Sequence, residues 1–282
     1  TINKLKQKKI PITLINARIT NKSYNKWVSL GNFSKNLFYK FDLCLSSSEV
    51  SQKYLKKLGA KNIKMIGNLK FSQSEYEKIE LNENYKKIIS SKKVWCAAST
   101  HPTEEILCGL VHKKLKRKFK NLLTIIIPRH IERSHEIEIQ LKKIGLKVQI
   151  IENLKKIKID TDIILINAYG KSKSFYNICK NVFLGGSIIN HGGQNPLEAT
   201  RFGCNVLYGP NISNFKEIYN FLSEKKIAYK IKNQSAMATQ LDNLFSRKNT
   251  YKKIQKKLKV LGRKILDLTF KEIHFIINKD EI

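Results

Sequence analysis

The sequence is poor in acidic residues and has no long uninterrupted apolar segment. It contains 22 Asp and Glu against 54 Lys and Arg, which gives a formal net charge of +32 over 282 residues. A membrane-spanning helix needs about 20 consecutive apolar residues, and no stretch of these residues reaches that length. We therefore expect no part of them to span a bilayer.

Cysteine and histidine are scarce and scattered. The five cysteines are odd in number and form no C-x-x-C pair, and the six histidines form no H-x-x-x-H pair on a predicted helix. Because metal sites and disulfide frameworks need such spacings, we predict no metal site and no cofactor. The thiols are predicted to be reduced and mostly buried, as in a cytosolic protein.

The excess of lysine has two interpretations. It favours an anionic partner, such as nucleic acid, a membrane surface or a phosphorylated substrate, with basic runs at 112–120 and 251–259. Alternatively, it reflects a general enrichment, because Lys, Ile and Asn crowd the whole sequence. No zinc-finger spacing, RNA-binding signature or basic-aromatic stripe accompanies the lysines. We therefore predict no nucleic-acid partner.

Apolar runs alternate with helical patterns along the chain, which is typical of parallel α/β sheets. The predicted strands are 10–16, 41–48, 63–70, 93–100, 122–128, 147–151, 162–167, 182–184 and 204–210. The polar stretch 72–92 separates two series of such elements. The predicted organisation is one domain over residues 1–75, a linker over 76–92 and a second domain over 93–282 that ends in a long basic helix. The first series has too few strands for a doubly wound domain, so we expect it to be the C-terminal part of one.

Several predicted strands end in loops with polar residues, and open α/β sheets bind ligands at that edge. The first such loop, at 97–105, offers Ser99 and His101. The next, at 128–133, contains Arg129, whose guanidinium suits phosphate oxygens, although a salt bridge to Glu132 is the structural alternative.

Residues 182–199 combine a strand with two pairs of glycines and a helix start. Gly186 and Ser187 follow the strand, and such glycine turns let the backbone approach a ligand. Asn195 is a suitable N-cap for a helix with proline in its first position and Glu198 in its third. A helix start of this kind favours phosphate binding, although simple capping is the alternative. A D-x-D pattern at 160–162 resembles a metal-binding signature of glycosyltransferases, but it opens a strand and favours a turn instead.

Six segments occur together in an order and spacing that resemble one enzyme family, the 3-deoxy-D-manno-octulosonic acid (Kdo) transferases. The segments are 15–20, 67–71, 97–105, 128–133, 182–199 and 209–218. The family transfers Kdo from CMP-Kdo to the lipid A precursor, lipid IVA, in lipopolysaccharide biosynthesis. The resemblance therefore implies a GT-B fold, with two Rossmann-like domains that bind acceptor and nucleotide respectively, the acceptor domain being incomplete here.

The resemblance also implies roles for individual residues. The nucleotide contacts of the family fall on Pro128, Arg129, Tyr169, Gly170, Lys171, Asn195, Pro196, Leu197 and Glu198, with Ser99, His101, Gly186 and Ser187 in supporting loops. The lysine that stabilises the transition state falls on Lys70. Glu198 is expected near the ribose hydroxyls, and the glycine-rich segment and helix start are expected to cradle CMP.

The sequence departs from the family pattern at several positions. The segment 167–172 lacks the usual acidic residues, and Gln194 and Ile131 replace a histidine and a proline. The family's glutamate base and membrane anchor align upstream of Thr1, so we expect these 282 residues alone to be inactive in transfer. The carboxylates within residues 1–72 are Asp42 and Glu49.

The resemblance further implies that the enzyme acts with inversion at the cytoplasmic face of the inner membrane, on an anionic surface. The alternatives are a GT-B enzyme that uses a UDP-sugar, such as a 2-epimerase or a GlcNAc transferase, and a basic nucleic-acid-binding protein.

Overall fold

The computed structural model describes residues 1–72, 89–152, 157–247 and 251–278. The chain forms two compact units, one of residues 1–75 with 257–282 and one of residues 76–256. Most of the linker expected at 76–92 lies outside the described residues.

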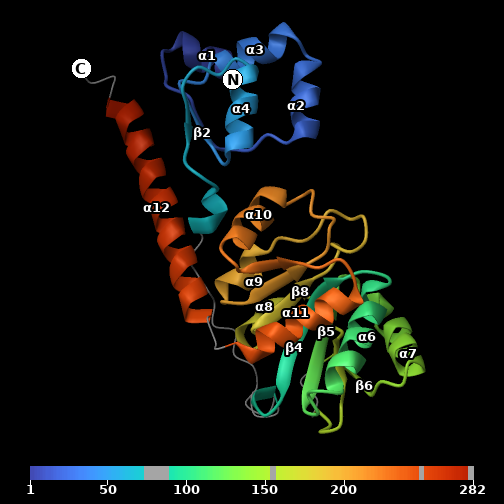
Figure 1. The fold of residues 1–282 in the computed structure, drawn as a ribbon. Helices are drawn as coiled ribbons and strands as arrows, with labels where there is room; N and C mark the ends of the chain where they lie inside the picture. The colour runs from blue at the N-terminus through green and yellow to red at the C-terminus, as the bar shows by residue number, and fades with distance from the viewer. Residues whose placement is uncertain (73–88, 153–156, 248–250, 279–282) are drawn as a thin grey trace. The chain divides into compact units, whose positions relative to one another are not determined.

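The smaller unit is built on a three-stranded parallel sheet in the order β1-β2-β3 (Figure 1). Its described elements before the terminal helix are α1 (Ile2–Gln7), β1 (Thr13–Ala17), α2 (Asn21–Val28), α3 (Asn32–Tyr39), β2 (Leu43–Ser46), α4 (Glu49–Lys57), β3 (Ile63–Met65) and the 3₁₀ turn η1 (Leu69–Ser72). Ser48 caps α4 by accepting a hydrogen bond from the Ser51 N–H at 3.2 Å. Phe38, Cys44 and Leu55 lie in its core.

The structure corrects the predicted third strand, which ends at Met65 rather than at residue 70. Gly67 has a φ of +111°, which takes the backbone out of the extended region. The Asn68 side chain then accepts a hydrogen bond from the Lys70 N–H at 2.9 Å and starts η1. The segment 17–40, to which the sequence pattern assigned no element, contains α2 and α3.

The larger unit contains a seven-stranded sheet in the order β10-β9-β8-β4-β5-β7-β6, with every neighbouring pair parallel. This confirms the predicted parallel α/β class. Its strands are β4 (Lys93–Thr100), β5 (Leu122–Pro128), β6 (Val148–Ile151), β7 (Ile163–Ile166), β8 (Asn181–Leu184), β9 (Asn205–Tyr208) and β10 (Ala228–Lys230). Its helices are α6 (Glu104–Lys116), η2 (Ile131–Arg133), α7 (Ser134–Lys143), α8 (Ser172–Ile178), α9 (Leu197–Arg201), α10 (Lys216–Glu224) and α11 (Gln234–Ser246).

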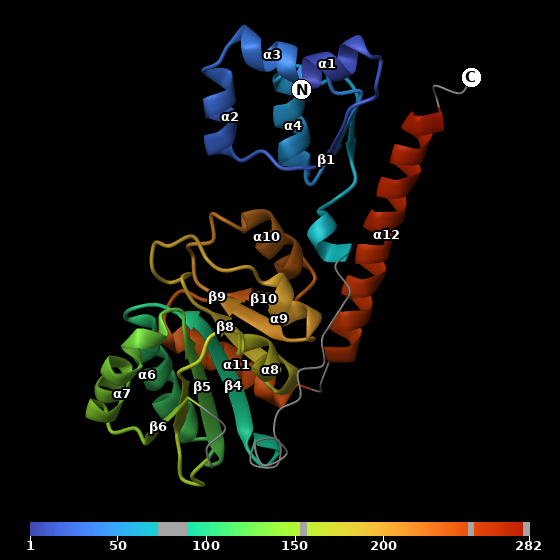
Figure 2. The same ribbon diagram turned by 180° about the vertical axis from the view of Figure 1, so that it is seen from behind.

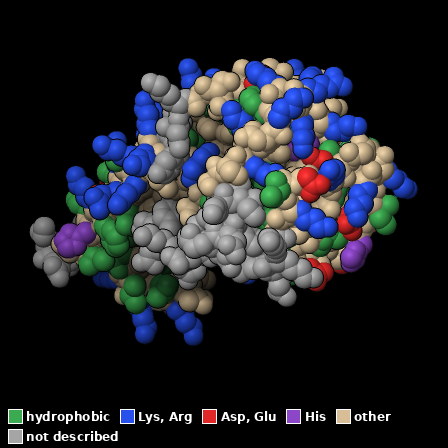
Figure 3. All heavy atoms as spheres, turned by 90° about the horizontal axis from the view of Figure 1, so that it is seen from below, with side chains coloured by type: hydrophobic (Ala, Val, Ile, Leu, Met, Phe, Trp, Pro, Cys, Tyr) green, Lys and Arg blue, Asp and Glu red, His purple; other side chains and the backbone are tan. Residues whose placement is uncertain are grey.

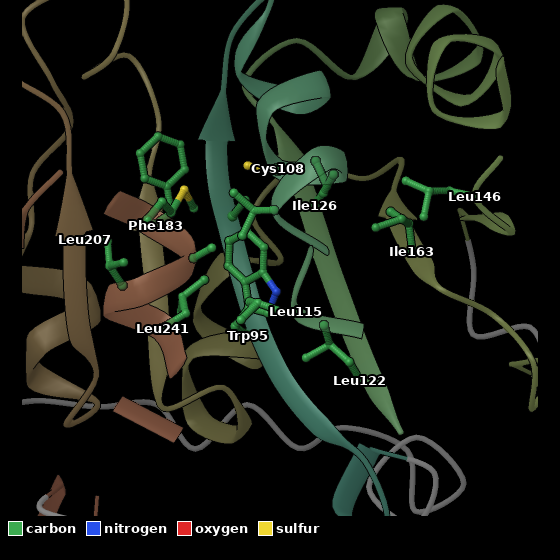
Figure 4. Packing of buried hydrophobic residues seen from close by; sticks show 14 of the residues in the cluster. Trp95, Cys108, Leu115, Leu122, Ile126, Leu146, Ile163, Phe183, Leu207 and Leu241 are labelled. Carbon is green, nitrogen blue, oxygen red and sulfur yellow. The ribbon is translucent and has the colours of Figure 1, made fainter. Parts of the chain in front are cut away.

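Helices cover both faces of the larger sheet, with α6, α7 and α11 on one face and α8 and α9 on the other (Figures 1 and 2). Trp95 of β4 is fully buried on the face that α6, α7 and α11 cover. Phe183 and Leu207 from neighbouring strands and Leu241 from α11 belong to the same core (Figure 4). Successive residues of β4 point to opposite faces, so the strand is apolar on both sides and central in the sheet.

The terminal helix α12 (Tyr251–Ile277) is present as expected, but most of it does not belong to the second domain. Residues from Lys257 onward group with the smaller unit. Gly262 explains this placement, because a Cβ there would lie 2.3 Å from the Phe71 carbonyl oxygen. The backbone of α12 therefore packs directly against the segment that follows β3, and the Glu272 carboxylate accepts a hydrogen bond from Lys64 at 2.5 Å. No described helix is both long enough and apolar enough to cross a membrane.

All five cysteines are buried and free, which confirms the predicted buried thiols. The basic side chains are spread widely over the face drawn in Figure 3, and the few acidic side chains gather at one side of it. The surface view therefore shows no single basic patch on that face.

Candidate functional site

The loop after β4 has an unusual backbone. Ser99 and Thr103 both have positive φ, +53° and +78°, although neither is glycine. Such conformations cost about 1–3 kcal/mol each and often occur at functional sites. Between them lies His101, whose exposed fraction is 6%. The β4–β5 ladder shifts register between Ala98 and Thr100, so the strain begins where the sheet ends.

Glu104, the first residue of α6, is fully buried and joins this loop to the loop after β8. One carboxylate oxygen accepts hydrogen bonds from the N–H groups of His101 at 3.0 Å and Gly186 at 2.7 Å. The other accepts from the N–H groups of Ser187 at 3.2 Å and Ile188 at 3.0 Å. The sequence pattern used Glu104 only as a marker of a helix start and missed this role.

These hydrogen bonds change the role expected for the first glycine pair, Gly185 and Gly186. The N–H groups of Gly186 and Ser187, predicted to support a ligand, are directed at Glu104 instead. A Cβ on Gly185 would lie 2.3 Å from the Ser99 carbonyl oxygen, so this glycine allows the two loops to touch. Glu104 and the segment 185–188 that it binds therefore form the floor of the site. The N–H groups bound to Glu104 do not donate to a ligand.

A second buried carboxylate, Glu105, lies beside Glu104 and forms an ion pair with Arg133 at 3.1 Å. Burial raises the pKa of Glu105, and the hydrogen bond and charge of Arg133 oppose this effect. Arg133 comes from η2, so the pair attaches the loop after β5 to the start of α6.

Pro128 and Arg129 end β5 at the same edge of the sheet. Pro128 is buried and pairs with Thr100, and the Arg129 N–H donates to the Thr100 carbonyl at 2.9 Å. The Arg129 side chain is exposed, and no hydrogen bond or ion pair joins its guanidinium to another residue in the described part of the chain. The alternative salt bridge to Glu132 does not form, because Glu132 instead accepts from the Tyr169 hydroxyl at 3.2 Å.

The loop after β7 brings Tyr169, Gly170 and Lys171 to this edge. Tyr169 is 66% exposed and Lys171 precedes α8 as its N-cap residue. Gly170 has a φ of +73°, and a Cβ there would meet no atom within 4 Å. This glycine is therefore required by the turn, and the space beside it is open.

The helix start predicted at 195–198 forms one residue later than expected. α9 begins at Leu197 with Pro196 as its N-cap, and it has only five residues. The Asn195 side chain accepts a hydrogen bond from the Leu197 N–H at 3.1 Å, so it still satisfies the helix start. The Glu198 carboxylate lies 3.8 Å from the Lys173 ammonium group.

Three histidines from three loops meet above the floor formed by Glu104. The His101 ring lies 4.3 Å from that of His191 and 5.9 Å from that of His130, measured between ring centroids. Burial, followed by the charges of His191, His130, Arg129 and Arg133, lowers the pKa of His101 to about 4. The sequence named His101 as a supporting residue but gave no sign that the three rings meet, because they are 29 and 61 residues apart along the chain.

The D-x-D pattern is structural, as predicted. Asp162 accepts hydrogen bonds from Lys116 and from the Lys147 N–H, and Asp160 pairs with the Lys147 ammonium group at 2.8 Å. Both precede β7 and so lie at the opposite edge from the loops described above. Among the described residues, no group of three or more His, Cys, Asp or Glu is arranged to hold a metal ion.

Lys70 lies in the smaller unit, in η1 directly after β3. Its side chain is exposed. The neighbouring Leu69 N–H donates to the Asn16 side chain at 3.1 Å. This bond joins the ends of β1 and β3, so two of the segments that carry the family resemblance come together at the carboxyl edge of this sheet.

Comparison with known proteins gives one recurrent family name. The family profile described as 3-deoxy-D-manno-octulosonic-acid transferase (kdotransferase) matches residues 1–73. The chain is 29% identical to the 3-deoxy-D-manno-octulosonic acid transferase of Aquifex aeolicus over 252 residues, and 30% identical to that of Rickettsia felis over 243 residues. The chain is therefore similar to Kdo transferases over most of its length. These alignments cover 89% and 85% of the chain and 67% and 52% of the two relatives, so the chain spans about half to two thirds of their length.

Solved structures share the fold of the chain. The C-terminal CMP-Kdo binding domain of WaaA from Acinetobacter baumannii matches 65% of the chain, with 94% of that domain covered, a TM-score of 0.53 and 23% identity. A UDP-N-acetylglucosamine 2-epimerase matches 97% of the chain and is itself covered to 69%, with a TM-score of 0.60 and 13% identity. Both identities are low, so these likenesses show the fold alone, which is that of GT-B glycosyltransferases.

Proposed function

We propose that the chain is part of an enzyme that transfers Kdo from CMP-Kdo to the lipid A precursor, lipid IVA, with inversion at the sugar. The observation that carries this proposal is the convergence of the loops after β4, β5, β7 and β8 at one edge of a unit that resembles a CMP-Kdo binding domain. The similarity to Kdo transferases supports the reaction class, and the geometry supports the nucleotide site.

The chemistry that this edge offers is stabilisation of one negative charge. CMP-Kdo has a single phosphate, so its leaving group develops charge on one phosphate group. The Arg129 guanidinium is suited to that charge, because it can donate two parallel N–H bonds to phosphate oxygens. We assign the same task in the smaller unit to Lys70. Pro128, Tyr169 and Gly170 would border the cytidine, and Glu198 would accept from the ribose hydroxyls.

The acceptor hydroxyl must lose its proton during transfer, and a carboxylate is the expected base. Asp42 is unsuited to this task, because it accepts hydrogen bonds from Lys6 and from the Ile12 N–H at 2.7 Å before β2 begins. Glu49 lies in the first turn of α4, where a carboxylate stabilises the helix dipole. We therefore propose neither carboxylate of residues 1–72 as the base.

A nucleotide competition separates this function from its nearest rival. Calorimetry with the purified chain should show that CMP binds more tightly than UMP or UDP. A UDP-sugar enzyme, which the epimerase-like fold also allows, would prefer UDP because a diphosphate gains further donors. Preference for UDP would reject the Kdo transferase proposal, and transfer from CMP-Kdo to lipid IVA by the enzyme would establish it.

We also propose that the smaller unit meets an anionic membrane surface. The end of α2, the turn after it and the start of α3 expose Val28 and Leu30 by 50% each and Phe33 by 64%, with Lys26 and Lys35 beside them in sequence. Apolar side chains flanked by lysines suit an interface with anionic lipid.

Vesicle sedimentation tests this surface. Vesicles that contain phosphatidylglycerol should bind the chain, salt should weaken binding by screening, and the double change Leu30→Ser, Phe33→Ser should weaken it further. A matched double change, Ile139→Ser with Ile159→Ser, alters exposed apolar residues of the larger unit and should have no effect. Equal binding to phosphatidylcholine vesicles would reject this part of the proposal.

A further inference from the structure

The surroundings of the three histidines at the edge of the larger sheet favour the binding of an anion. His101 is buried, and its Nε2 atom has no hydrogen-bond partner among the described residues. Buried polar atoms are nearly always paired, so an unpaired one beside a predicted ligand site needs an explanation. His191 and His130 pack against the His101 ring and are themselves exposed.

Gly186 lets two of these rings approach the backbone closely. A Cβ built on Gly186 would lie 3.1 Å from Cδ2 of His191 and 3.2 Å from Nε2 of His101. Any larger residue would press on both rings. The floor formed by Glu104 holds this glycine in place through its N–H, so the arrangement of the rings is fixed by buried hydrogen bonds.

The charges around the cluster favour an anion rather than a cation. Arg129 and Arg133 both act on the His101 ring as positive charges. The carboxylates nearby are engaged elsewhere: Glu104 with four backbone N–H groups and Glu105 with Arg133. Glu132 lies 3.4 Å from Nδ1 of His130 and also accepts from Tyr169, and so it contacts the cluster at its outer side.

We propose that His130 and His191, held by the buried His101, bind an anionic oxygen of the donor together with Arg129, and that the cluster takes up a proton as it does so. This inference rests on the proposed function for the identity of the donor. The oxygen belongs to the phosphate or to the sugar carboxylate, and the same chemistry serves both. His101 is a positioning residue, and His130 and His191 are the binding residues.

The direction of the proton uptake follows from the electrostatics. Without a ligand, burial and the charges of His191, His130, Arg129 and Arg133 hold the pKa of His101 low, at about 4. An anion against the cluster offsets these effects and raises the pKa of His101. Protons are then bound more tightly with ligand than without it, and by linkage the affinity rises as the pH falls.

The test uses a ligand whose own charge is fixed. Free CMP titrates near pH 6, as phosphate monoesters do, but its methyl ester is a phosphodiester that stays singly charged, like the phosphate of CMP-Kdo. Calorimetry in buffers with different ionisation enthalpies then measures protons taken up by the protein. We expect uptake of about 0.3–1 proton per ligand near pH 6, and an affinity that rises up to tenfold per pH unit below about pH 7.

Single substitutions assign the uptake to the cluster. His191→Gln and His130→Gln change exposed residues and should each reduce the uptake by at least about half. His101→Gln should reduce it as well, and the other two variants keep the test valid if that protein folds poorly. His135→Gln is the matched control, because His135 is exposed and lies on α7.

A second ligand identifies the anionic oxygen. The methyl glycoside of Kdo carries the carboxylate without the phosphate. Uptake with the phosphodiester assigns the cluster to the phosphate, and uptake with the glycoside assigns it to the carboxylate. Normal binding of the phosphodiester and the glycoside without uptake, or uptake unchanged in the His191 and His130 variants, would overturn the inference. Failure of CMP to bind in preference to UMP would instead reject the proposed function.

Discussion

The inner residues of the candidate site and the residues at its rim use charge in different ways. The inner carboxylates, Glu104 and Glu105, are fully buried, and backbone N–H groups and one arginine compensate their charge. At the rim, Arg129 and Lys171 are exposed and have no ion pair in the described parts of the chain. The buried carboxylates therefore hold loops together, whereas the exposed cations are available to a ligand.

This comparison predicts that loss of an inner carboxylate costs stability. Glu104→Ala would leave four buried N–H groups without acceptors, and each such group costs about 1–3 kcal/mol. We expect the free energy of unfolding of the larger unit to fall by at least about 3 kcal/mol.

Tryptophan fluorescence during urea unfolding can measure this. The chain has two tryptophans, so in a Trp27→Phe background Trp95 alone reports on the larger unit. The control is Glu136→Ala, whose side chain is 56% exposed on α7, and which should cost less than about 0.5 kcal/mol. If Glu104→Ala costs as little as the control, the inner carboxylates are not structural.

The second inner carboxylate gives a prediction that depends on pH. Arg133→Met removes the cation that opposes the raised pKa of Glu105, so that pKa rises further. A carboxyl whose folded pKa exceeds its unfolded value destabilises the protein as the pH rises from the unfolded pKa to the folded one. The stability deficit of the variant should therefore be small below about pH 4 and reach about 2–3 kcal/mol near pH 7.

Urea unfolding of the same tryptophan variant at several pH values measures this deficit. Adding Glu105→Gln to Arg133→Met should remove the pH dependence of the deficit, because no buried charge at Glu105 is then left uncompensated. A deficit that is the same at pH 4 and pH 7 would show that Arg133 acts through packing rather than charge.

The sequence predicted the rim better than the interior. Arg129, Gly170 and the helix start near Asn195 follow apolar strands, and the carboxyl edge of a parallel sheet gathers such loops whatever their detail. The roles of Glu104 and the histidine cluster were not predictable in this way. They depend on which loops touch, and Gly185 decides that through one close backbone approach to Ser99.

In the smaller unit the sheet could be predicted and two helices could not. β1 and β2 are compact apolar runs. Helix α2 is only eight residues long, is polar on average and has no buried residue. The position of α12 also escaped prediction, because Gly262 is one small residue in a long basic helix and its contact with Phe71 joins segments 191 residues apart.

At the rim, Arg129→Ala should weaken CMP binding without loss of stability. A hydrogen bond to a charged group contributes about 1.5–3 kcal/mol, which is roughly 12- to 150-fold in affinity. Calorimetry measures the affinity, and the tryptophan assay should show a stability change below about 0.5 kcal/mol. Arg117→Ala removes the same charge at the far end of α6 and is the matched control. Equal affinities for the two variants would remove Arg129 from the site.

The smallest effect is expected at Tyr169, where ring and hydroxyl have different partners. The hydroxyl donates to Glu132 at 3.2 Å at an exposed position, and such bonds contribute little. The ring is 66% exposed, so a nucleotide that covers it would gain apolar contact. Tyr169→Phe should therefore change CMP affinity by less than about threefold, whereas Tyr169→Ala should weaken it by about tenfold. Calorimetry on the two variants separates these roles, because an equal loss in both would show that the hydroxyl, rather than the ring, meets the nucleotide.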